Sequence, residues 1–358
     1  MRFIHIIGSA TMFTKDVYEM ISNNFKEDNH IFVSKFVNHY NYTQIQGAER
    51  IKSKSLKMLI YLYKSDFIIV HGLINKLVVI LLFFQPWLLK KVNWIVWGGD
   101  IYPNGDKKIS IFNKIIIKMR NKIIPKIKYI STLTTGDYNY LIKNYDLNNY
   151  HFEISYPVIA SNKKLLDKNL RDRKKQNHVN ILIGNSATKT NQHFEALDLL
   201  EKFKNEDIKI YIPLSYGQKD FELYADEVIK YGKEIFGDKI IPIKELMTGE
   251  EYLKFLNSID IGIFNNNRQQ AMGNISQLLM LGKKVYIRTD TNMWKHFTGL
   301  GCNIFDIESL KSYSNFEELV FMKDSDIEDN IRRLTIRNSI ETKISQWKTM
   351  VAEMKKDR

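Results

Sequence analysis

The feature that most constrains the fold is a series of short, continuous apolar runs that alternate with segments of helical periodicity. In the first half of the chain these runs cover residues 3–7, 31–36, 67–70, 94–97 and 129–133. In the second half they cover residues 179–183, 208–213, 240–242, 259–264 and 284–287. Uninterrupted apolar strands are typical of parallel sheets that are covered on both faces. The sequence therefore predicts an α/β fold with two parallel sheets in series.

The two predicted sheets imply two domains. A chain of 358 residues is long enough for two separate cores. We expect an N-terminal domain over residues 1–160, a basic linker without apolar periodicity over 161–176, and a second domain over 177–325, with a cleft between the domains. A long helical pattern over residues 327–354 predicts a C-terminal helical segment, 326–358, that packs back across both domains.

The net charge of +13 is concentrated in the first half of the chain. Residues 1–160 carry 21 Lys and Arg against 11 Asp and Glu, and residues 161–176 carry 7 against 2, whereas residues 177–358 carry 25 against 27. One domain should therefore prefer an anionic surface, either a membrane or a nucleic acid. The single cysteine, Cys302, allows no intrachain disulfide and no cysteine metal cluster, which fits a reducing cytosol.

The stretch over residues 67–89 is strongly apolar but is interrupted by polar residues, glycine and proline. Its uninterrupted part, residues 77–84, is far below the ~20 residues that a membrane-spanning helix needs. We expect a buried strand, a functional turn at His71-Gly72 and a buried helix rather than a membrane span.

A polar turn follows the strand predicted over residues 179–183. It consists of Gly184, Asn185 and Ser186, with Asn191 and His193 just beyond. Ligands of open parallel sheets bind at the carboxyl ends of the strands. A turn of this kind offers backbone N–H groups, a hydroxyl and a helix N-terminus, from which diphosphate sites are made. A plain polar turn with a Ser or Thr N-cap is the alternative.

A second polar loop follows the strand predicted to end at residue 264. It runs through three asparagines to Arg268, Gln269, Gln270, Gly273 and Asn274. An arginine can bind a phosphate group through two parallel hydrogen bonds, whereas a lysine meets it as a point charge. We expect this loop to bind phosphate rather than to be a simple Asn-rich turn.

A third polar segment, Gly98-Gly99-Asp100, follows the run that contains Trp94 and Trp97. The two glycines allow a ligand to approach the backbone closely. Aromatic rings beside a carboxylate commonly hold and deprotonate a sugar, so Asp100 is a candidate general base. The alternative is an aspartate that caps a helix after a glycine turn.

A basic segment extends over residues 107–128. It contains eight Lys and Arg residues, no acidic residue, and interleaved isoleucines. Such a helix suits anionic lipid headgroups, through Lys114, Lys118, Arg120 and Lys122. A core helix with a solvated lysine face is the alternative. Nucleic acid would call for aromatic and arginine residues among the charges, where isoleucines stand instead.

The order of these motifs resembles the bacterial 4-acetamido-4,6-dideoxygalactose transferases of glycosyltransferase family 56, which act on lipid-linked intermediates of enterobacterial common antigen. The segments that carry the resemblance span nearly the whole chain. They are residues 5–9, His71-Gly72 with Asn75, residues 94–102, Gly136-Asp137, residues 183–186 with Asn191 and His193, Pro213, Tyr216, residues 260–262, residues 268–270 with Gly273, Gly282 and Trp294.

The resemblance implies a GT-B architecture of two Rossmann-like domains and an inverting reaction with no essential metal or cofactor. It implies that a dTDP-sugar donor is bound by the second domain, through Gly184, Asn185, Ser186, Asn191, Tyr216, Arg268, Gln269, Gln270, Gly273 and Asn274. It implies that the lipid-linked saccharide acceptor is bound by the first domain, through Gly8, Ser9, Trp97, Gly98, Gly99 and Tyr102. Asp100 or His71 would take the proton of the acceptor hydroxyl. The protein would act on the cytoplasmic face of the inner membrane, in O-antigen or common-antigen biosynthesis.

Two other classes of protein remain open at this point. A nucleotide-sugar epimerase can share the two-domain shape but needs no basic, lipid-facing segment. A nucleic-acid-binding protein would explain the charge but neither of the two polar loops in the second domain. We therefore expect no nucleic-acid partner.

Overall fold

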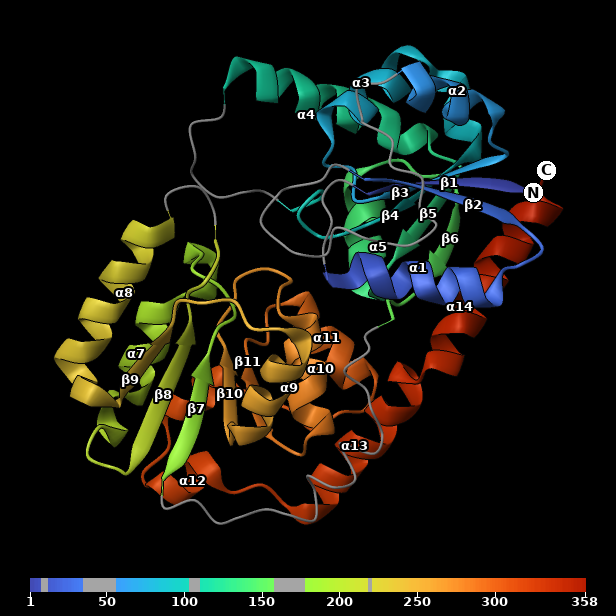
Figure 1. Ribbon diagram of the computed structural model, residues 1–358. Coiled ribbons are helices and arrows are strands. Elements are labelled where there is room, and N and C mark those ends of the chain that lie inside the picture. Colours follow the sequence, from blue (N-terminus) through green and yellow to red (C-terminus); the bar gives the residue numbers. More distant parts are fainter. Residues whose placement is uncertain (8–11, 35–55, 103–109, 158–177, 218–220) are drawn as a thin grey trace. The chain divides into compact units, whose positions relative to one another are not determined.

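Figure 1 shows the computed structural model of the chain, which describes residues 1–7, 12–34, 56–102, 110–157, 178–217 and 221–358. The chain forms two compact units: Met1–Ile159 with Asn338–Arg358, and Ala160–Arg337. Each unit has its own parallel sheet with helices on both faces. The predicted α/β class with two parallel sheets is confirmed. The predicted linker over 161–176 lies outside the described residues.

The sheet of the first unit has six parallel strands in the order β2-β1-β3-β4-β5-β6. Its strands are β1 (Arg2–Ile7), β2 (Asn29–Ser34), β3 (Phe67–His71), β4 (Val92–Ile95), β5 (Tyr129–Thr132) and β6 (Tyr150–Glu153). Sequence reasoning missed β6, because this edge strand is partly exposed along its whole length and so lacks an apolar run.

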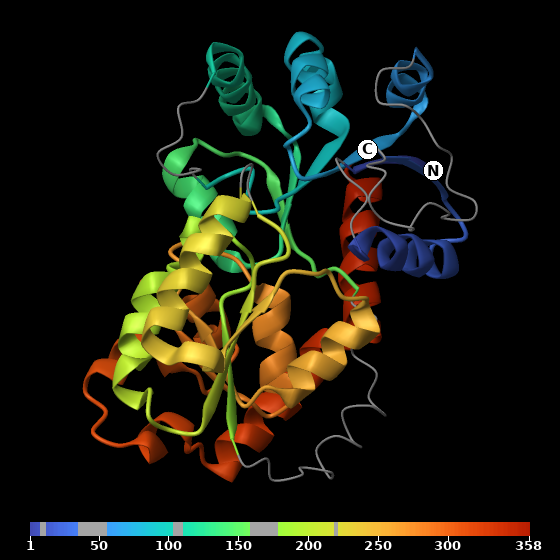
Figure 2. The same cartoon turned by 60° about the vertical axis from the view of Figure 1, so that its left-hand side comes forward.

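Alternate residues of these strands build a core on each face of the sheet. Ile4 and Ile6 pack with α2, α3 and α4, whereas Phe3 and Ile7 pack with α1 and α14. Figures 1 and 2 show α2, α3 and α4 together on one face. The helices of this unit are α1 (Met12–Asn24), α2 (Leu56–Lys64), α3 (Lys76–Phe84), η1 (Pro86–Lys91), α4 (Ile111–Ile123), η2 (Ile124–Lys126), α5 (Thr135–Asn144) and α14 (Ile340–Lys356).

The sheet of the second unit also has six parallel strands, in the order β12-β11-β10-β7-β8-β9. Its strands are β7 (Val179–Ile183), β8 (Ile208–Pro213), β9 (Ile240–Ile243), β10 (Ile261–Phe264), β11 (Lys284–Ile287) and β12 (Phe305–Asp306). Sequence reasoning missed β12, because its two residues are too few to form an apolar run.

Two cores also cover the faces of this second sheet. Ile181 and Ile183 pack with α7 and α8, and Leu182 packs with α9, α10 and α11. The helices of this unit are η3 (Lys189–Asn191), α7 (His193–Leu200), η4 (Glu201–Phe203), α8 (Phe221–Phe236), η5 (Gly237–Lys239), α9 (Gly249–Ser258), α10 (Met272–Met280), α11 (Asn292–Gly299), η6 (Ile307–Lys311), α12 (Phe316–Val320) and α13 (Asp324–Asn338).

The predicted C-terminal helical segment consists of two helices, α13 and α14. The break lies at Ser339, whose side chain accepts a hydrogen bond from the N–H of Thr342 and thereby caps α14. Apart from its last residue, α13 belongs to the second unit, and α14 belongs to the first. In the first unit Trp347 and Met350 of α14 are fully buried against the sheet.

The apolar stretch over residues 67–89 forms β3, a turn at Gly72, and α3 followed by η1. This agrees with the predicted order of strand, turn and helix. Across the described ranges of the chain, no helix is long and apolar enough to cross a bilayer.

Candidate functional site

The second sheet has its topological switch point between β7 and β10. These two strands are neighbours, and from them the chain proceeds in opposite directions, through β8 to β9 and through β11 to β12. Open α/β sheets bind ligands at such a point, outside the carboxyl ends of the strands. The two polar loops predicted to bind the donor follow these two strands, so the fold brings them together.

The turn after β7 requires glycine at its first position. Gly184 has φ +68°, and a Cβ atom there would lie 2.7 Å from Oδ1 of Asn191 and 2.9 Å from Nε2 of His193. The Asn191 Oδ1 atom accepts a hydrogen bond from the N–H of Asn185 (2.9 Å), which holds the turn in place. The glycine therefore lets a buried amide approach the backbone directly behind the strand end.

An amide network joins the two loops. Asn266 is fully buried, and its Nδ2 donates to Oδ1 of Asn191 (3.0 Å) and to Oε1 of Gln270 (3.3 Å). The hydroxyl of Thr190 also donates to Oε1 of Gln270 (2.6 Å). The predicted residues Asn185, Asn191 and Gln270 are thus brought together. Asn266 and Thr190 were not singled out from sequence, since a lone amide or hydroxyl in a polar loop carries no distinctive signal.

Two helices begin after the loops that follow these strands. The N-cap residues of α7 and α10 are Gln192 (φ 51°) and Ala271 (φ 55°), and within the described residues neither side chain caps its helix. Positive φ is uncommon for residues other than glycine and accumulates at functional sites. Unsatisfied N–H groups at helix N-termini favour anions. The sequence alternative of a Ser or Thr N-cap does not hold for α7, whose N-cap residue is Gln192. Thr188 is the N-cap residue of η3, and within the described residues its side chain makes no capping bond.

The remaining predicted donor residues surround this network. Burial lowers the pKa of Arg268 from its usual high value, and this side chain is half-buried beside the β10 loop. The Tyr216 hydroxyl accepts from Nδ2 of Asn185 (3.2 Å). The side chain of Asn274 forms a hydrogen bond with Tyr252. Ser186 is buried within the turn, Gln269 is half-buried, and Gly273 is exposed with open space where a Cβ would stand.

His193 is the first residue of α7 and is fully buried. Its Nδ1 lies 3.0 Å from the hydroxyl of Tyr224, and burial lowers the pKa of His193 to about 4. The ring is therefore neutral at neutral pH. Its Nε2 packs against Gly184.

The first sheet has its switch point between β1 and β3. The predicted acceptor residues Gly8 and Ser9, which follow β1, lie outside the described residues. After β3 comes Gly72, with φ +76°, where a Cβ would meet the ring of Trp97 at 3.2 Å. The turns after β3 and β4 are therefore packed against each other.

Asp100 ties these two turns together. It is 1% exposed, and its Oδ2 accepts hydrogen bonds from the N–H of Leu73 and from Nε1 of Trp94, both at 2.8 Å. Its Oδ1 accepts from the N–H of Trp97 (3.0 Å). Burial raises the pKa of Asp100 despite these hydrogen bonds, which act in the opposite direction. No helix begins at this turn in the described part of the chain, so the N-capping alternative is wrong.

His71, the other predicted catalytic residue, is buried at the end of β3. Its Nδ1 lies 2.7 Å from the hydroxyl of Tyr156, which also accepts from Nε1 of Trp97 (2.8 Å). Burial lowers the pKa of His71 to about 3. Tyr156 was not predicted, because only the fold brings it to His71.

The other predicted acceptor residues lie in the turn after β4. Gly98 adopts φ +66°, and the exposed Gly99 has little near the position of a Cβ. The hydroxyl of Tyr102 donates to Oδ1 of Asp137 (2.7 Å). These groups form the carboxyl edge of the first sheet together with Trp97 and Asp100.

The predicted basic helix is α4, over Ile111–Ile123. Lys114, Lys118 and Lys122 are exposed, and Arg120 is half-buried. Not all of the apolar residues enter the core. Ile111 is 78% exposed and Phe112 is 53% exposed, and Ile115 is exposed beside them. The helix thus presents ammonium groups and large apolar side chains to solvent together.

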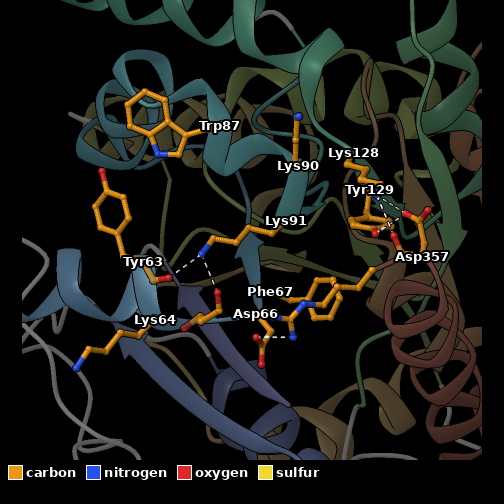
Figure 3. Close-up of a pocket in the computed structure, with 12 residues that line it drawn as sticks. Tyr63, Lys64, Asp66, Phe67, Trp87, Lys90, Lys91, Lys128, Tyr129 and Asp357 are labelled. Atoms are coloured by element: carbon orange, nitrogen blue, oxygen red, sulfur yellow. Dashed lines mark hydrogen bonds and ion pairs between the residues drawn. The ribbon is translucent and has the colours of Figure 1, made fainter.

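A pocket of about 460 Å³ lies at the opposite, amino-terminal ends of β3 to β5 (Figure 3). Lys91 donates there to the carbonyl oxygens of Leu62 (2.6 Å) and Ser65 (2.7 Å), and Lys128 pairs with Asp357 (2.6 Å). Lys91 and Lys128 are thus engaged within the protein. The pocket contains none of the predicted donor or acceptor residues.

Comparison with known proteins identifies the family and the fold. Residues 12–313 match the family described as "4-alpha-L-fucosyltransferase glycosyl transferase group 56". A glycosyltransferase from Rickettsia africae ESF-5 is 14% identical, with a TM-score of 0.69, and the alignment covers 100% of this chain and 99% of that one. WaaG, a glycosyltransferase involved in lipopolysaccharide biosynthesis, is 9% identical, with a TM-score of 0.62 over 98% of this chain and 99% of its own.

A further solved structure is trehalose-6-phosphate from E. coli bound with UDP-2-fluoro glucose, which is 9% identical, with a TM-score of 0.65 over 99% of each chain. At such low sequence identities the structural similarity establishes the fold alone, which is of the GT-B type. The family match extends over most of the sequence. The protein therefore belongs to glycosyltransferase family 56 and is a glycosyltransferase.

Proposed function

We propose that the protein transfers a 4-amino-4,6-dideoxyhexose, such as 4-acetamido-4,6-dideoxygalactose, from a dTDP-sugar to a polyprenyl-diphosphate-linked saccharide, with inversion at the anomeric carbon. The product belongs to O-antigen or common-antigen biosynthesis. Membership of family 56 supports glycosyl transfer. The bound UDP-2-fluoro glucose of the E. coli structure supports a nucleotide-sugar donor, and the role of WaaG supports a cell-surface polysaccharide.

The observation that carries the proposal is the cluster at the β7–β10 switch point. Two helix N-termini without side-chain caps among the described residues, the Gly184 turn and the Arg268 loop meet at the carboxyl ends of adjacent strands. Backbone N–H groups and a guanidinium group stabilise the charge that develops on a departing diphosphate. No metal ion takes part in the proposed step.

The acceptor binds at the carboxyl edge of the first sheet in this proposal. Its hydroxyl oxygen attacks the anomeric carbon in a single displacement, and its proton leaves through Tyr156 to His71. Asp100 acts as a positioning residue, because three hydrogen-bond donors already occupy its carboxylate. The different contacts of the two predicted catalytic residues support this division of roles.

Attachment to the inner face of the bacterial inner membrane is the third part of the proposal. The exposed lysines and apolar side chains of α4 support it, since basic residues near an anionic surface contribute roughly 1 kcal/mol each and apolar side chains enter the headgroup region. A lipid-linked acceptor would then be presented in the plane that the enzyme occupies.

Nucleotide binding tests the donor site with a matched pair of glycine variants. Gly184→Ala introduces a Cβ into the Asn191 amide, whereas Gly237→Ala has nearly the same backbone strain (φ +59°) but nothing within 4 Å. Calorimetry should show that the wild type and Gly237→Ala bind dTDP more tightly than UDP or ADP, and that Gly184→Ala binds it weakly. Equal dTDP binding by both variants would remove this turn from the site.

A transfer assay tests the reaction itself. Purified enzyme, a panel of dTDP-sugars and lipid-linked saccharides should give a glycosylated lipid in mass spectra. Interconversion of nucleotide sugars without an acceptor would instead identify an epimerase, and a thermal shift with an oligonucleotide alone would identify a nucleic-acid-binding protein.

A further inference from the structure

A continuous line of hydrogen-bonded side chains runs through the first unit. At one end, Nε1 of Trp97 donates to the hydroxyl of Tyr156 (2.8 Å), and this hydroxyl lies 2.7 Å from Nδ1 of His71. The Nε2 of His71 lies 3.1 Å from Nδ1 of His5. The Nε2 of His5 lies 2.9 Å from Nδ1 of His30.

The line leads from the carboxyl ends of the strands towards their amino ends. His71 is the last residue of β3, at the carboxyl edge where the acceptor is proposed to bind. His30 is the second residue of β2 and pairs in register with Phe3, near the amino edge. His5 lies between them in β1, on the face that packs against α1 and α14.

Aromatic rings pack against the middle of the line. His5 stacks on Phe32, with ring centroids 4.4 Å apart, and Trp347 stacks on both His5 (6.5 Å) and His71 (6.2 Å). Burial lowers the pKa of His71 to about 3, the pKa of His30 to about 4, and the pKa of His5 well below its usual value. All three imidazoles are therefore neutral at neutral pH.

Neutral imidazoles in this line must share one tautomer. Each neutral ring has one donor and one acceptor nitrogen. When His71 accepts at Nδ1 from Tyr156, its Nε2–H donates to His5, and the Nε2–H of His5 donates to His30. In the opposite arrangement every ring carries its proton on Nδ1. When one proton enters the line at Tyr156 and another leaves at His30, all three rings change from the Nε2-protonated to the Nδ1-protonated tautomer.

The two ends have different surroundings. The negative charge of Asp100 acts on Tyr156 at the carboxyl edge. At the amino edge, Nε2 of His30 is buried and has no hydrogen-bond partner among the described residues. Asp28 is the carboxylate whose charge acts on His30, and it pairs with the N-terminal ammonium (2.8 Å) and with Lys355 (2.5 Å). The line therefore ends at a half-buried ring whose outer nitrogen is bonded to none of the described residues.

We propose that Tyr156, His71, His5 and His30 form a proton-transfer line that serves glycosyl transfer. The inference rests on the proposed function, in which an acceptor hydroxyl loses its proton at the carboxyl edge. The acceptor oxygen bonds to the anomeric carbon as the bond from that carbon to the diphosphate breaks. The hydroxyl proton passes to the oxygen of Tyr156, which gives its own proton to Nδ1 of His71.

The remaining transfers complete the balance. The Nε2 protons of His71 and His5 each move to the Nδ1 atom of the next ring. The His30 side chain is half-buried rather than fully buried, and at this partly exposed end of the line it passes its Nε2 proton to solvent. Every ring ends neutral, with its proton on Nδ1, and exchange with solvent restores the Nε2-protonated tautomer between turnovers. Burial makes His71 a weak base. The line removes the proton of the acceptor without needing a strong base.

Replacing His5 tests the line at an interior position, between His71 and His30. In His5→Gln the amide can donate and accept hydrogen bonds but cannot relay a proton from one neighbour to the next. His151→Gln is the matched control: this histidine lies in β6 of the same sheet, bonds to the hydroxyl of Thr132 (2.8 Å), and is outside the line. Turnover, KM values and solvent deuterium isotope effects are measured across pH for the folded fraction of each variant.

We expect turnover of His5→Gln to fall by roughly 10²-fold, the scale of lost proton-transfer catalysis, with unchanged KM values. Its rate should rise with pH as hydroxide replaces the line, and the curved proton inventory of the wild type should become linear. His151→Gln should keep the wild-type rate and pH profile. Equal turnover and equal pH profiles for the two variants would overturn the line.

A second measurement does not depend on the variants folding. In wild-type protein with 15N-labelled histidine, nuclear magnetic resonance at pH 7 should find His5, His30 and His71 neutral and in one shared tautomer. Mixed tautomers or a charged ring would overturn the proposal. A wild type that transfers no sugar would instead contradict the proposed function, which distinguishes the two failures.

Discussion

Asparagine in place of Asp100 tests what this buried carboxylate does. In the wild type, Oδ2 accepts from Leu73 and Trp94 and Oδ1 accepts from Trp97. Asparagine has a single acceptor oxygen. If that oxygen keeps the two bonds of Oδ2, the new amide nitrogen faces the N–H of Trp97, so two donors meet in a site that water does not reach.

The expected loss of stability follows from these three bonds. A hydrogen bond to a charged group contributes ~1.5–3 kcal/mol and a neutral one ~0.5–1.5 kcal/mol, and a buried N–H left without an acceptor costs ~1–3 kcal/mol. Relief of the desolvation cost of the carboxylate acts in the opposite direction. We expect the free energy of unfolding to fall by about 2–4 kcal/mol, which lowers the Tm by roughly 5–15 °C for a unit of this size.

Calorimetry and kinetics on the same samples separate the two roles of Asp100. The variant should melt at a lower temperature, bind dTDP normally, and retain turnover within about tenfold when assayed well below its Tm. Trp94→Phe removes one donor and keeps the carboxylate, so it should also destabilise the protein while turnover is preserved. If the Tm of Asp100→Asn equals that of the wild type, the three hydrogen bonds do not contribute the stability expected here. A turnover loss of ~10²–10⁴-fold in folded variant would make Asp100 the general base.

Three further predictions address the donor site, the membrane and acid stability. Arg268→Ala should weaken dTDP binding by ~1.5–3 kcal/mol, with partial rescue by lysine, and unchanged affinity in calorimetry would remove Arg268 from the site. Glutamate at Lys114, Lys118 and Lys122 should lower binding to anionic liposomes, most at low salt, while activity on a short, water-soluble acceptor survives; equal sedimentation would mean a solvated helix face. Because burial lowers the pKa of His193 to about 4, the unfolded state binds more protons between pH 6.5 and 4. The contribution of His193 to stability, present above pH 6.5, should therefore be lost as the pH falls towards 4, by up to about 3 kcal/mol. In denaturant titrations His193→Gln should remove this contribution and leave those of His5, His30 and His71.

The buried strands and the fold class could be predicted from local sequence. Strands such as β1, β3 and β7 are covered on both faces, so their residues must be continuously apolar, and that pattern is visible without any tertiary information. The edge strands β6 and β12 lack this requirement and were missed. The break at Ser339 was also missed, because a capping serine inside a helical pattern looks like an ordinary polar position.

The candidate donor site was only partly visible in the sequence. Glycine and amide-rich loops after two strands marked Asn185, Asn191 and Gln270, but their proximity depends on β7 and β10 being neighbours, which is a property of strand order. Asn266 carries the contacts between the loops and has no signal of its own. Local sequence thus indicated which loops to examine, and strand order decided that they form one site.

The contacts of the buried polar residues were decided by tertiary structure alone. The sequence marked Asp100 and His71 as polar residues at strand ends, where either could act as a base. Asp100 accepts from Leu73, which is 27 positions away, and Tyr156 meets His71 across 85 positions. Hydrogen bonds over such separations exist only once the sheet has formed, because the chain between the partners must first fold. Composition and periodicity therefore determined the scaffold of this protein, and only the packed structure decided which of its polar groups contact one another.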